Sequence, residues 1–165
     1  MTKEKSSMTG KTHIIGGVAA SLAFAQITNY EPVILLGAGV VGALIPDICH
    51  GSSKIGRALP LLSKLINGLF GHRTFTHSLL FLLLSAVLLH NFMPMEAISA
   101  GLLVGMASHI VLDMATKRGV KLFFPFRWTI RFPVTATTGG TSEYMVFALL
   151  SLLCVYFGYD VFLPL

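Results

Sequence analysis

Long apolar runs alternate with short polar segments along the 165-residue chain, and this alternation predicts membrane-spanning helices. Polar residues, proline or glycine bound each run. Several runs are short against the roughly 20 residues that a helix needs to cross the hydrocarbon, so their polar ends must lie close to the lipid. We expect five spans, in the runs Ile14 to Ile27, Val33 to Ile45, Ser78 to Phe92, Ala97 to Leu112 and Met145 to Leu165.

Two polar segments between these runs carry patterns of their own. Lys54 to Phe70, KIGRALPLLSKLINGLF, places apolar residues at helical spacing with basic residues between them. This pattern predicts an amphipathic helix that lies along the membrane surface. Lys117 to Val134 mixes phenylalanine, tryptophan and arginine with two prolines, which predicts an irregular loop or short hairpin at headgroup level.

The composition supports a membrane protein, because 54% of the residues are hydrophobic and only 12% are charged. The expected fold class is all-α: a polytopic membrane helical bundle of about five transmembrane helices plus an interfacial amphipathic helix. We expect a single integral membrane domain over residues 1–165, with residues 1–11 as a flexible cytoplasmic N-terminus. The first apolar run lacks a clear cleavage site and is not interpreted as a signal peptide.

The basic residues predict the orientation. All twelve lysines and arginines lie before the first run, between the second and third, or between the fourth and fifth, while the opposite loops carry none. The positive-inside rule therefore predicts a multi-pass membrane protein with a cytoplasmic N-terminus. The net charge of +5 then reflects topology and contact with anionic lipid rather than nucleic-acid binding. Cys49 and Cys154 are not expected to form a disulfide.

Most histidines and acids fall at the predicted cytoplasmic ends of the spans. His109 and Asp113, four residues apart, share one face of a helix. Asp47 and His50 share a face if their helix continues, and His72 and His77 would face one centre from a turn and a helix. The full set is His13, Asp47, His50, His72, His77, His109, Asp113 and Glu143.

Nitrogen and carboxylate ligands suit zinc, manganese or non-haem iron, whereas magnesium and calcium prefer oxygen alone. A single histidine or aspartate at a span end is more often a solvated group than a ligand. Eight on one face favour a metal site, because buried carboxylates are costly unless paired or metal-bound. We expect one to three divalent ions, with zinc favoured. Thr76 is expected to cap the third span, and Cys49 to be an inert buried thiol.

Three motifs resemble the YdjM-like family of bacterial inner-membrane proteins, described as predicted membrane-bound metal-dependent hydrolases. They are LIPDICH (Leu44 to His50), GHRTFTHS (Gly71 to Ser78) and SHIVLDMATKRGVKLFFPF (Ser108 to Phe126), preceded by an early histidine. The resemblance implies a helical membrane protein with metal ligands at His13, Asp47, His50, His72, His77, His109 and Asp113, and a matching glutamate at Glu143.

The chain departs from the family pattern at two positions. The family commonly has Pro-Asp-Ile-Asp-His, whereas Cys49 replaces the second aspartate here, and Lys117 stands where a proline usually follows threonine. The first change bears on the identity or number of the metal ions. A fainter similarity to zinc-dependent phospholipase C and P1-type nucleases favours phosphoester chemistry.

The leading hypothesis is a metal-dependent hydrolase that cleaves a phosphoester of a membrane lipid or lipid-linked substrate at the cytoplasmic face. Asp47, Asp113 or Glu143 would serve as general base. Arg73 with Arg127 or Arg131 would neutralise the phosphate, although Arg127 and Arg131 also fit a plain positive-inside loop. The alternatives are a metal ion or proton transporter, which should place ionisable groups near the midplane, and a non-catalytic scaffold with a structural metal.

Overall fold

The computed structural model describes residues 8–71 and 73–163, which are mostly helical and form no β-strand. This confirms the all-α prediction. The elements in chain order are α1 (Gly10–Ala25), α2 (Pro32–Gly42), the 3₁₀ helix η1 (Ile45–Cys49), α3 (Lys54–Ala58), α4 (Pro60–Phe70), the 3₁₀ helix η2 (Phe75–His77), α5 (Leu79–Phe92), α6 (Glu96–Met114) and α7 (Thr141–Phe162).

Each predicted apolar run corresponds to a helix, namely α1, α2, α5, α6 and α7. Three segments are long and apolar enough to cross a membrane: Pro32–Cys49, Glu96–Met114 and Thr141–Phe162. The apolar helix α5 has 14 residues and α1 has 16, so both are shorter than a full span. The number of five spans therefore stays a prediction.

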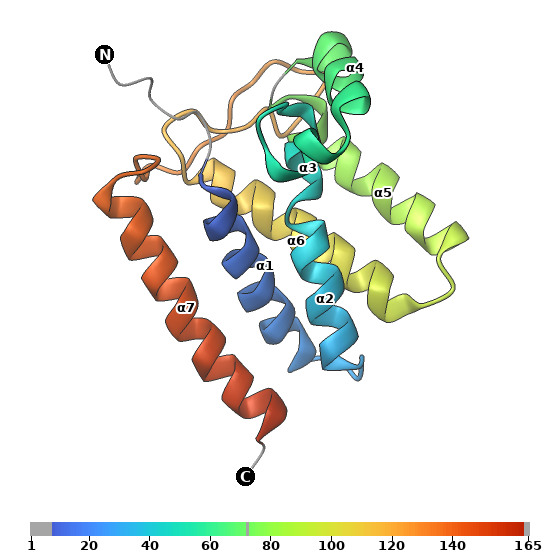
Figure 1. Cartoon of the computed structure of the whole chain (residues 1–165), viewed down its shortest axis with the longest axis vertical. Helices are drawn as coiled ribbons and strands as arrows, with labels where there is room; N and C mark the ends of the chain where they lie inside the picture. Colours follow the sequence, from blue (N-terminus) through green and yellow to red (C-terminus); the bar gives the residue numbers. More distant parts are fainter. Residues whose placement is uncertain (1–7, 72, 164–165) are drawn as a thin grey trace.

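The long helices lie side by side, with α1 between α7 and the pair formed by α2 and α6 (Figure 1). Helix α5 packs on α6. Helices α3 and α4 and the 115–140 loop gather at one end of the bundle, which we call the capped end (Figure 1). The described residues of the basic segments predicted to be cytoplasmic are found there. Of the N-terminal segment expected to be flexible, residues 1–7 lie outside the described part, and Gly10 and Lys11 already belong to α1.

Glycines allow α2 and α6 to touch through their backbones. A Cβ atom added to Gly105 would lie 2.1 Å from the carbonyl oxygen of Gly39, and one on Gly42 would lie 2.2 Å from that of Leu102. No side chain fits at such distances, so glycine sets the separation of the two helices. This contact brings the C-terminal end of α6 beside η1, at the capped end.

The amphipathic segment forms two helices, because Pro60 cannot donate the backbone hydrogen bond that would continue α3. Ser53 caps α3 by accepting a hydrogen bond from the Gly56 amide at 2.9 Å. Helix α4 exposes Leu61, Leu65 and Leu69. The amphipathic helix predicted here is confirmed.

The loop after α6 is irregular but tied together by two isolated bridges. Val120 and Ile130 exchange backbone hydrogen bonds of 3.0 and 2.8 Å in an antiparallel bridge, and Thr116 pairs with Ala136 in a parallel one. Phe126 and Trp128 at its tip are exposed. The expected short hairpin is therefore present in its smallest form.

Candidate metal centre

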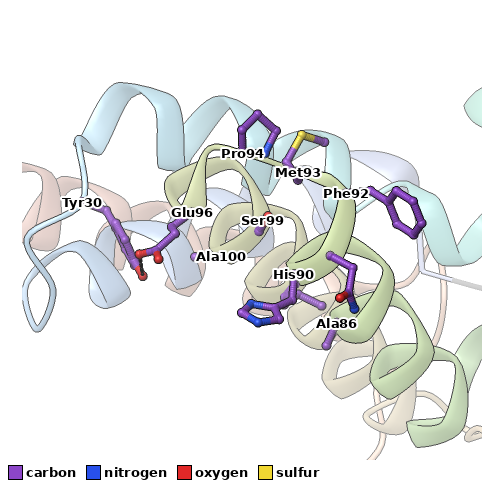
Figure 2. A pocket seen from close by; sticks show the side chains of 11 residues that line it. Tyr30, Ala86, His90, Phe92, Met93, Pro94, Glu96, Ser99 and Ala100 are labelled. Carbon is purple, nitrogen blue, oxygen red and sulfur yellow. Dashed lines mark hydrogen bonds between the residues drawn. The ribbon is translucent and has the colours of Figure 1, made fainter.

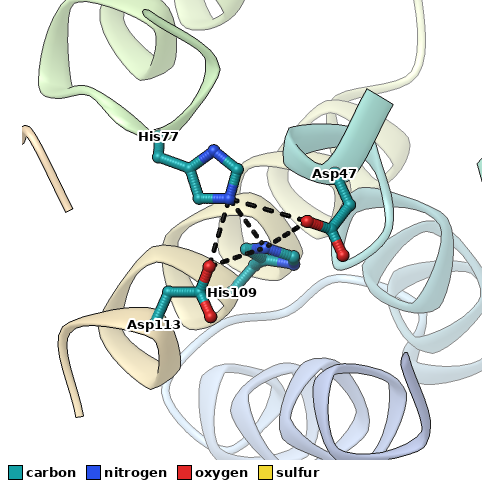
Figure 3. Close-up of side chains that lie close together, drawn as sticks. All are labelled: Asp47, His77, His109 and Asp113. Atoms are coloured by element: carbon teal, nitrogen blue, oxygen red, sulfur yellow. Dashed lines mark hydrogen bonds and ion pairs between the residues drawn. The ribbon is translucent and has the colours of Figure 1, made fainter. Parts of the chain in front are cut away.

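Four side chains meet at the capped end from three elements of the fold. Asp47 comes from η1, His77 from η2, and His109 and Asp113 from the last turns of α6 (Figure 3). One ligand atom from each lies within 4.8 Å of the other three, and all four residues are buried. Two turns of 3₁₀ helix thus aim their polar residues at the end of a long apolar helix.

The separations of the ligand atoms suit one metal ion. Nε2 of His77 lies 3.2 Å from both Nε2 of His109 and Oδ2 of Asp113, and the latter two are 3.6 Å apart. Oδ1 of Asp47 lies 3.7 and 3.8 Å from the two histidine nitrogens. Neighbouring ligands of a tetrahedral zinc are about 3.3 Å apart, given bonds of about 2.0–2.1 Å. The four atoms thus resemble the corners of a slightly expanded zinc site.

Both histidines are oriented by partners on the far side of the ring. Nδ1 of His109 donates a hydrogen bond to the Ala43 carbonyl at 2.6 Å, and Nδ1 of His77 lies 3.1 Å from the Thr76 hydroxyl. Since a carbonyl only accepts, Nδ1 of a neutral His109 carries the hydrogen and Nε2 presents its lone pair to the centre. Ser78, not Thr76, caps α5, because its hydroxyl accepts from the Phe81 amide. The prediction for Thr76 was therefore wrong.

The carboxylates supply the test of whether a metal fits. Oδ1 of Asp47 and Oδ2 of Asp113, the two oxygens that face the centre, are buried and accept no hydrogen bond. Such orphaned acceptors cost free energy unless a cation satisfies them. A divalent ion bound beside the two Nε2 atoms would offset the negative charge of both oxygens, so the residues fit a metal.

His13 lies beside the four-residue cluster. Its buried ring stacks on that of His109, with the centroids 3.7 Å apart and 13° between the planes. Nε2 of His13 lies 3.5 Å from Oδ1 of Asp113, and neither ring nitrogen makes a hydrogen bond. His13 therefore contacts a ligand oxygen that faces away from the centre.

Arg73 holds the same oxygen of Asp113. Its Nη2 forms an ion pair with Oδ1, while Nη1 donates to the Thr116 hydroxyl at 2.9 Å and lies 3.4 Å from the Gly119 carbonyl oxygen. The side chain is 6% exposed. The guanidinium is thus committed to protein groups rather than turned towards solvent.

The remaining predicted site residues lie outside the four-residue cluster or outside the described residues. His50 is half-buried with Nε2 2.7 Å from the Ser52 hydroxyl, because the chain leaves η1 for an extended conformation at His50. His72 lies outside the described residues. Arg127 and Arg131 are exposed on the 115–140 loop. Cys49 is fully buried beside the cluster, and its thiol lies 3.6 Å from the Pro46 carbonyl oxygen.

Glu143 joins the starts of two helices. Its Oε1 accepts hydrogen bonds from the Thr9 amide and hydroxyl, at 2.6 and 2.9 Å, and from the Thr12 hydroxyl at 2.7 Å. Its Oε2 accepts from the Gly139 amide at 2.6 Å. Both carboxylate oxygens are therefore engaged in holding α7 to the beginning of α1, apart from the four-residue cluster.

Sequence reasoning missed two contributors to the centre. The Ala43 carbonyl, which orients His109, gives no side-chain signal. The backbone contact between α2 and α6 does give one, because Gly101 and Gly105 are four residues apart, a spacing typical of close helix pairs in membranes.

We expect metal binding to weaken in acid. His77 lies outside the candidate spans; burial lowers its pKa, but the nearby Asp113 carboxylate and Cys49 outweigh burial and raise the pKa from 6.5 to about 9. Below that pH an ion must displace the proton. The apparent Zn²⁺ affinity should rise up to about tenfold per pH unit from pH 7 to 9. Calorimetric titrations across this range measure the slope, which should be the same in His50→Ala; a flat profile would contradict the expectation.

Comparisons with known proteins cover nearly the whole chain. The model of a family described as "YdjM inner membrane protein" matches residues 8–164. An "Uncharacterized protein YvsG" of Bacillus subtilis is 51% identical over 94% of this chain and 97% of its own length. "Inner membrane protein YdjM" of Escherichia coli is 36% identical over 82% of this chain and 74% of its own, as is that of Shigella flexneri. No solved structure matches the chain.

Proposed function

Since the chain belongs to the YdjM inner membrane protein family and carries a buried Asp/His/His/Asp group, we propose that it is a membrane-bound metal-dependent hydrolase. The family assignment confirms the resemblance expected from the motifs. The observation that carries the proposal is the pair of orphaned carboxylate oxygens, set at ligand separations from two histidine nitrogens. Zinc is the ion that best suits these donors, with manganese or iron as alternatives.

Unequal spacing within the cluster supports different roles for its members in this proposal. His77, His109 and Asp113 form a tight trio, with ligand atoms 3.2–3.6 Å apart and side chains that are fully buried. Oδ1 of Asp47 stands farther off, and its side chain is 10% exposed. In this proposal the trio holds the ion and Asp47, on the accessible side, takes the proton from the attacking water. A closed structural site would instead use all four residues equally.

A divalent ion at this centre would lower the pKa of a water molecule and offset negative charge on a phosphoester. Features of the capped end support a lipid or lipid-linked substrate. Helix α4 exposes leucines, and the 115–140 loop exposes Phe126 and Trp128 as membrane-interface anchors. Arg127 and Arg131 on that loop are exposed and would bind the phosphate at headgroup level.

Replacing Asp47 with asparagine tests the proposal. Asp47→Asn should keep the zinc content of wild type but lower hydrolysis by about 100-fold or more, because the amide cannot accept the proton. The assay is release of phosphate or phosphorylated headgroup, followed by ³¹P NMR, from vesicles of phosphatidylglycerol and phosphatidic acid with the zinc-loaded full chain. Asp160→Asn, at the opposite end of the bundle, is the matched control. Zinc-loaded wild type without hydrolysis, or an Asp47→Asn variant with full activity, would contradict the proposal.

One observation favours transport as a second candidate function. A cavity of about 800 Å³ opens at the end opposite the cluster, lined by residues that include His90, Glu96 and Ser99 (Figure 2). The Ser99 hydroxyl is buried and has no hydrogen-bond partner in the protein, so a water molecule or an ion in the cavity could bind to it. However, a Cβ on Gly105 would lie 2.1 Å from α2 backbone, so α2 and α6 are in direct backbone contact at a level between Ser99 and His109. Zn²⁺ flux into proteoliposomes would favour transport over hydrolysis.

A further inference from the structure

The carboxylate of Asp113 has two faces, and only one of them points at the metal centre. We infer that the Arg73 guanidinium occupies the place of a second cation on the other face, so that the centre holds one metal ion and Arg73 is a positioning residue for it. This inference rests on the proposed function, because it concerns the same site. It changes the expected roles of both His13 and Arg73.

The face of the Asp113 carboxylate that points away from the cluster lies beside His13, and the two residues could together bind a second ion. Oδ1 of Asp113 points away from the four-residue cluster, and Nε2 of His13 lies 3.5 Å from it. That separation is close to the about 3.3 Å between neighbouring ligands of one zinc ion. Both nitrogens of His13 are buried without hydrogen bonds. By these donors alone, a second ion could bind here, within the one to three ions expected from the sequence.

A protein cation already neutralises that oxygen. Nη2 of Arg73 forms an ion pair with Oδ1 of Asp113, and Nη1 is fixed by the Thr116 hydroxyl at 2.9 Å. Thr116 in turn donates to the Asp113 carbonyl at 2.7 Å, so its hydroxyl joins both ends of the pair. The guanidinium thus places a positive charge directly against this carboxylate oxygen.

The backbone at Arg73 also indicates that the side chain is held in place. Arg73 has a φ of 58°, in the left-handed region that residues with a Cβ rarely adopt. Such a conformation costs about 1–3 kcal/mol and persists where the surroundings enforce it. The described residues contain no other non-glycine with positive φ. Contacts with Asp113, Thr116 and Gly119 are the ones that enforce it here.

The formal charges favour one ion over two. Asp47 and Asp113 contribute two negative charges and Arg73 one positive charge, so a single divalent ion leaves the buried group with one net positive charge. A second ion would raise that charge to three beside an immovable guanidinium, which is costly away from water. One ion with Arg73 therefore suffices, and Arg73 is not available to the phosphate of a substrate.

The number of metal ions bound per chain directly tests whether the centre holds one ion or two. The full chain, purified in detergent and stripped of metal, is loaded with Mn²⁺ and analysed by elemental analysis and electron paramagnetic resonance. We expect one ion per chain with a six-line spectrum of an isolated ion. Two ions per chain with a spin-coupled spectrum would overturn the inference but leave the proposed function standing. No bound ion would overturn both.

Variants of Arg73 extend the test. Arg73→Ala removes the guanidinium, and we expect the number of Mn²⁺ ions to rise from one to two per chain at millimolar metal; Arg73→Ala with His13→Ala should return it to one. Arg73→Lys retains the charge and should stay at one. Arg118→Ala, which removes an exposed arginine of the neighbouring loop, is the control and should also bind one. A single ion in a folded Arg73→Ala variant would overturn the inference, and the wild-type count decides it if that variant does not fold.

Discussion

Joint replacement of His109 and Asp113 by alanine is expected to lower the affinity for Zn²⁺ by about 10⁴-fold, the largest effect on metal binding of the variants considered. Structural zinc contributes about 10–16 kcal/mol across four ligands, or about 3 kcal/mol for each ligand removed. His109 and Asp113 each supply one of the proposed ligand atoms, and these two atoms lie 3.6 Å apart. Both side chains are fully buried, so bulk water cannot replace them as ligands. Competition titration with a chelator of known zinc affinity measures the change.

The matched control for this experiment lies at the other end of the bundle. His90→Ala with Asp160→Ala removes the same two residue types from exposed positions. We expect its zinc affinity to equal that of wild type. An unchanged affinity in His109→Ala with Asp113→Ala would show that the bound ion lies elsewhere, and the proposed centre would have to be abandoned.

Gly105→Ala should have the largest effect on stability. The new Cβ would lie 2.1 Å from the Gly39 carbonyl oxygen and 2.7 Å from the Ala43 amide nitrogen, both backbone atoms that cannot rotate away. The two helices must move apart, at an expected cost of about 2–4 kcal/mol in the free energy of unfolding. Separation also pulls the Ala43 carbonyl away from His109, so zinc affinity should fall by about 10-fold or more. Thermal unfolding in detergent and zinc titration measure the two effects.

A second glycine of α2 provides the comparison. A Cβ on Gly37 would meet nothing within 4 Å, so Gly37→Ala changes the same residue type without a clash. Alanine favours a helix over glycine, and the stability of Gly37→Ala should equal or slightly exceed that of wild type. Equal unfolding temperatures for the two variants would mean that the close contact between α2 and α6 does not determine stability.

Much of the helical framework could be predicted because an apolar run in lipid has few alternatives to a helix. The pairing of His109 with Asp113 follows from the helical repeat alone. Asp47 and His50 were expected to share a face if their helix continues, but their segment is a short 3₁₀ helix that ends at Cys49, and the ring of His50 lies beside Ser52. The periodicity of a continuous helix could not reveal where that helix stops.

Contacts between residues far apart in the sequence could not be predicted from local sequence patterns. Arg73 was predicted to neutralise phosphate together with Arg127 or Arg131, whereas its guanidinium contacts Asp113, 40 residues away. Glu143 likewise contacts Thr9 and Thr12 across more than 130 residues. Contacts of this kind depend on how helices are arranged, which the hydrophobic pattern leaves undetermined.

The order of the elements bears on how the protein is made. The four residues of the cluster lie between positions 47 and 113, and α7 contributes none of them. Helix α7 buries no side chain except Glu143, which attaches it to the beginning of α1. A ribosome therefore completes the ligand set before it begins the last helix. The nascent chain therefore contains all four residues of the proposed metal centre while α7 is still unsynthesised, and α7 then joins helices that already carry the proposed ligands.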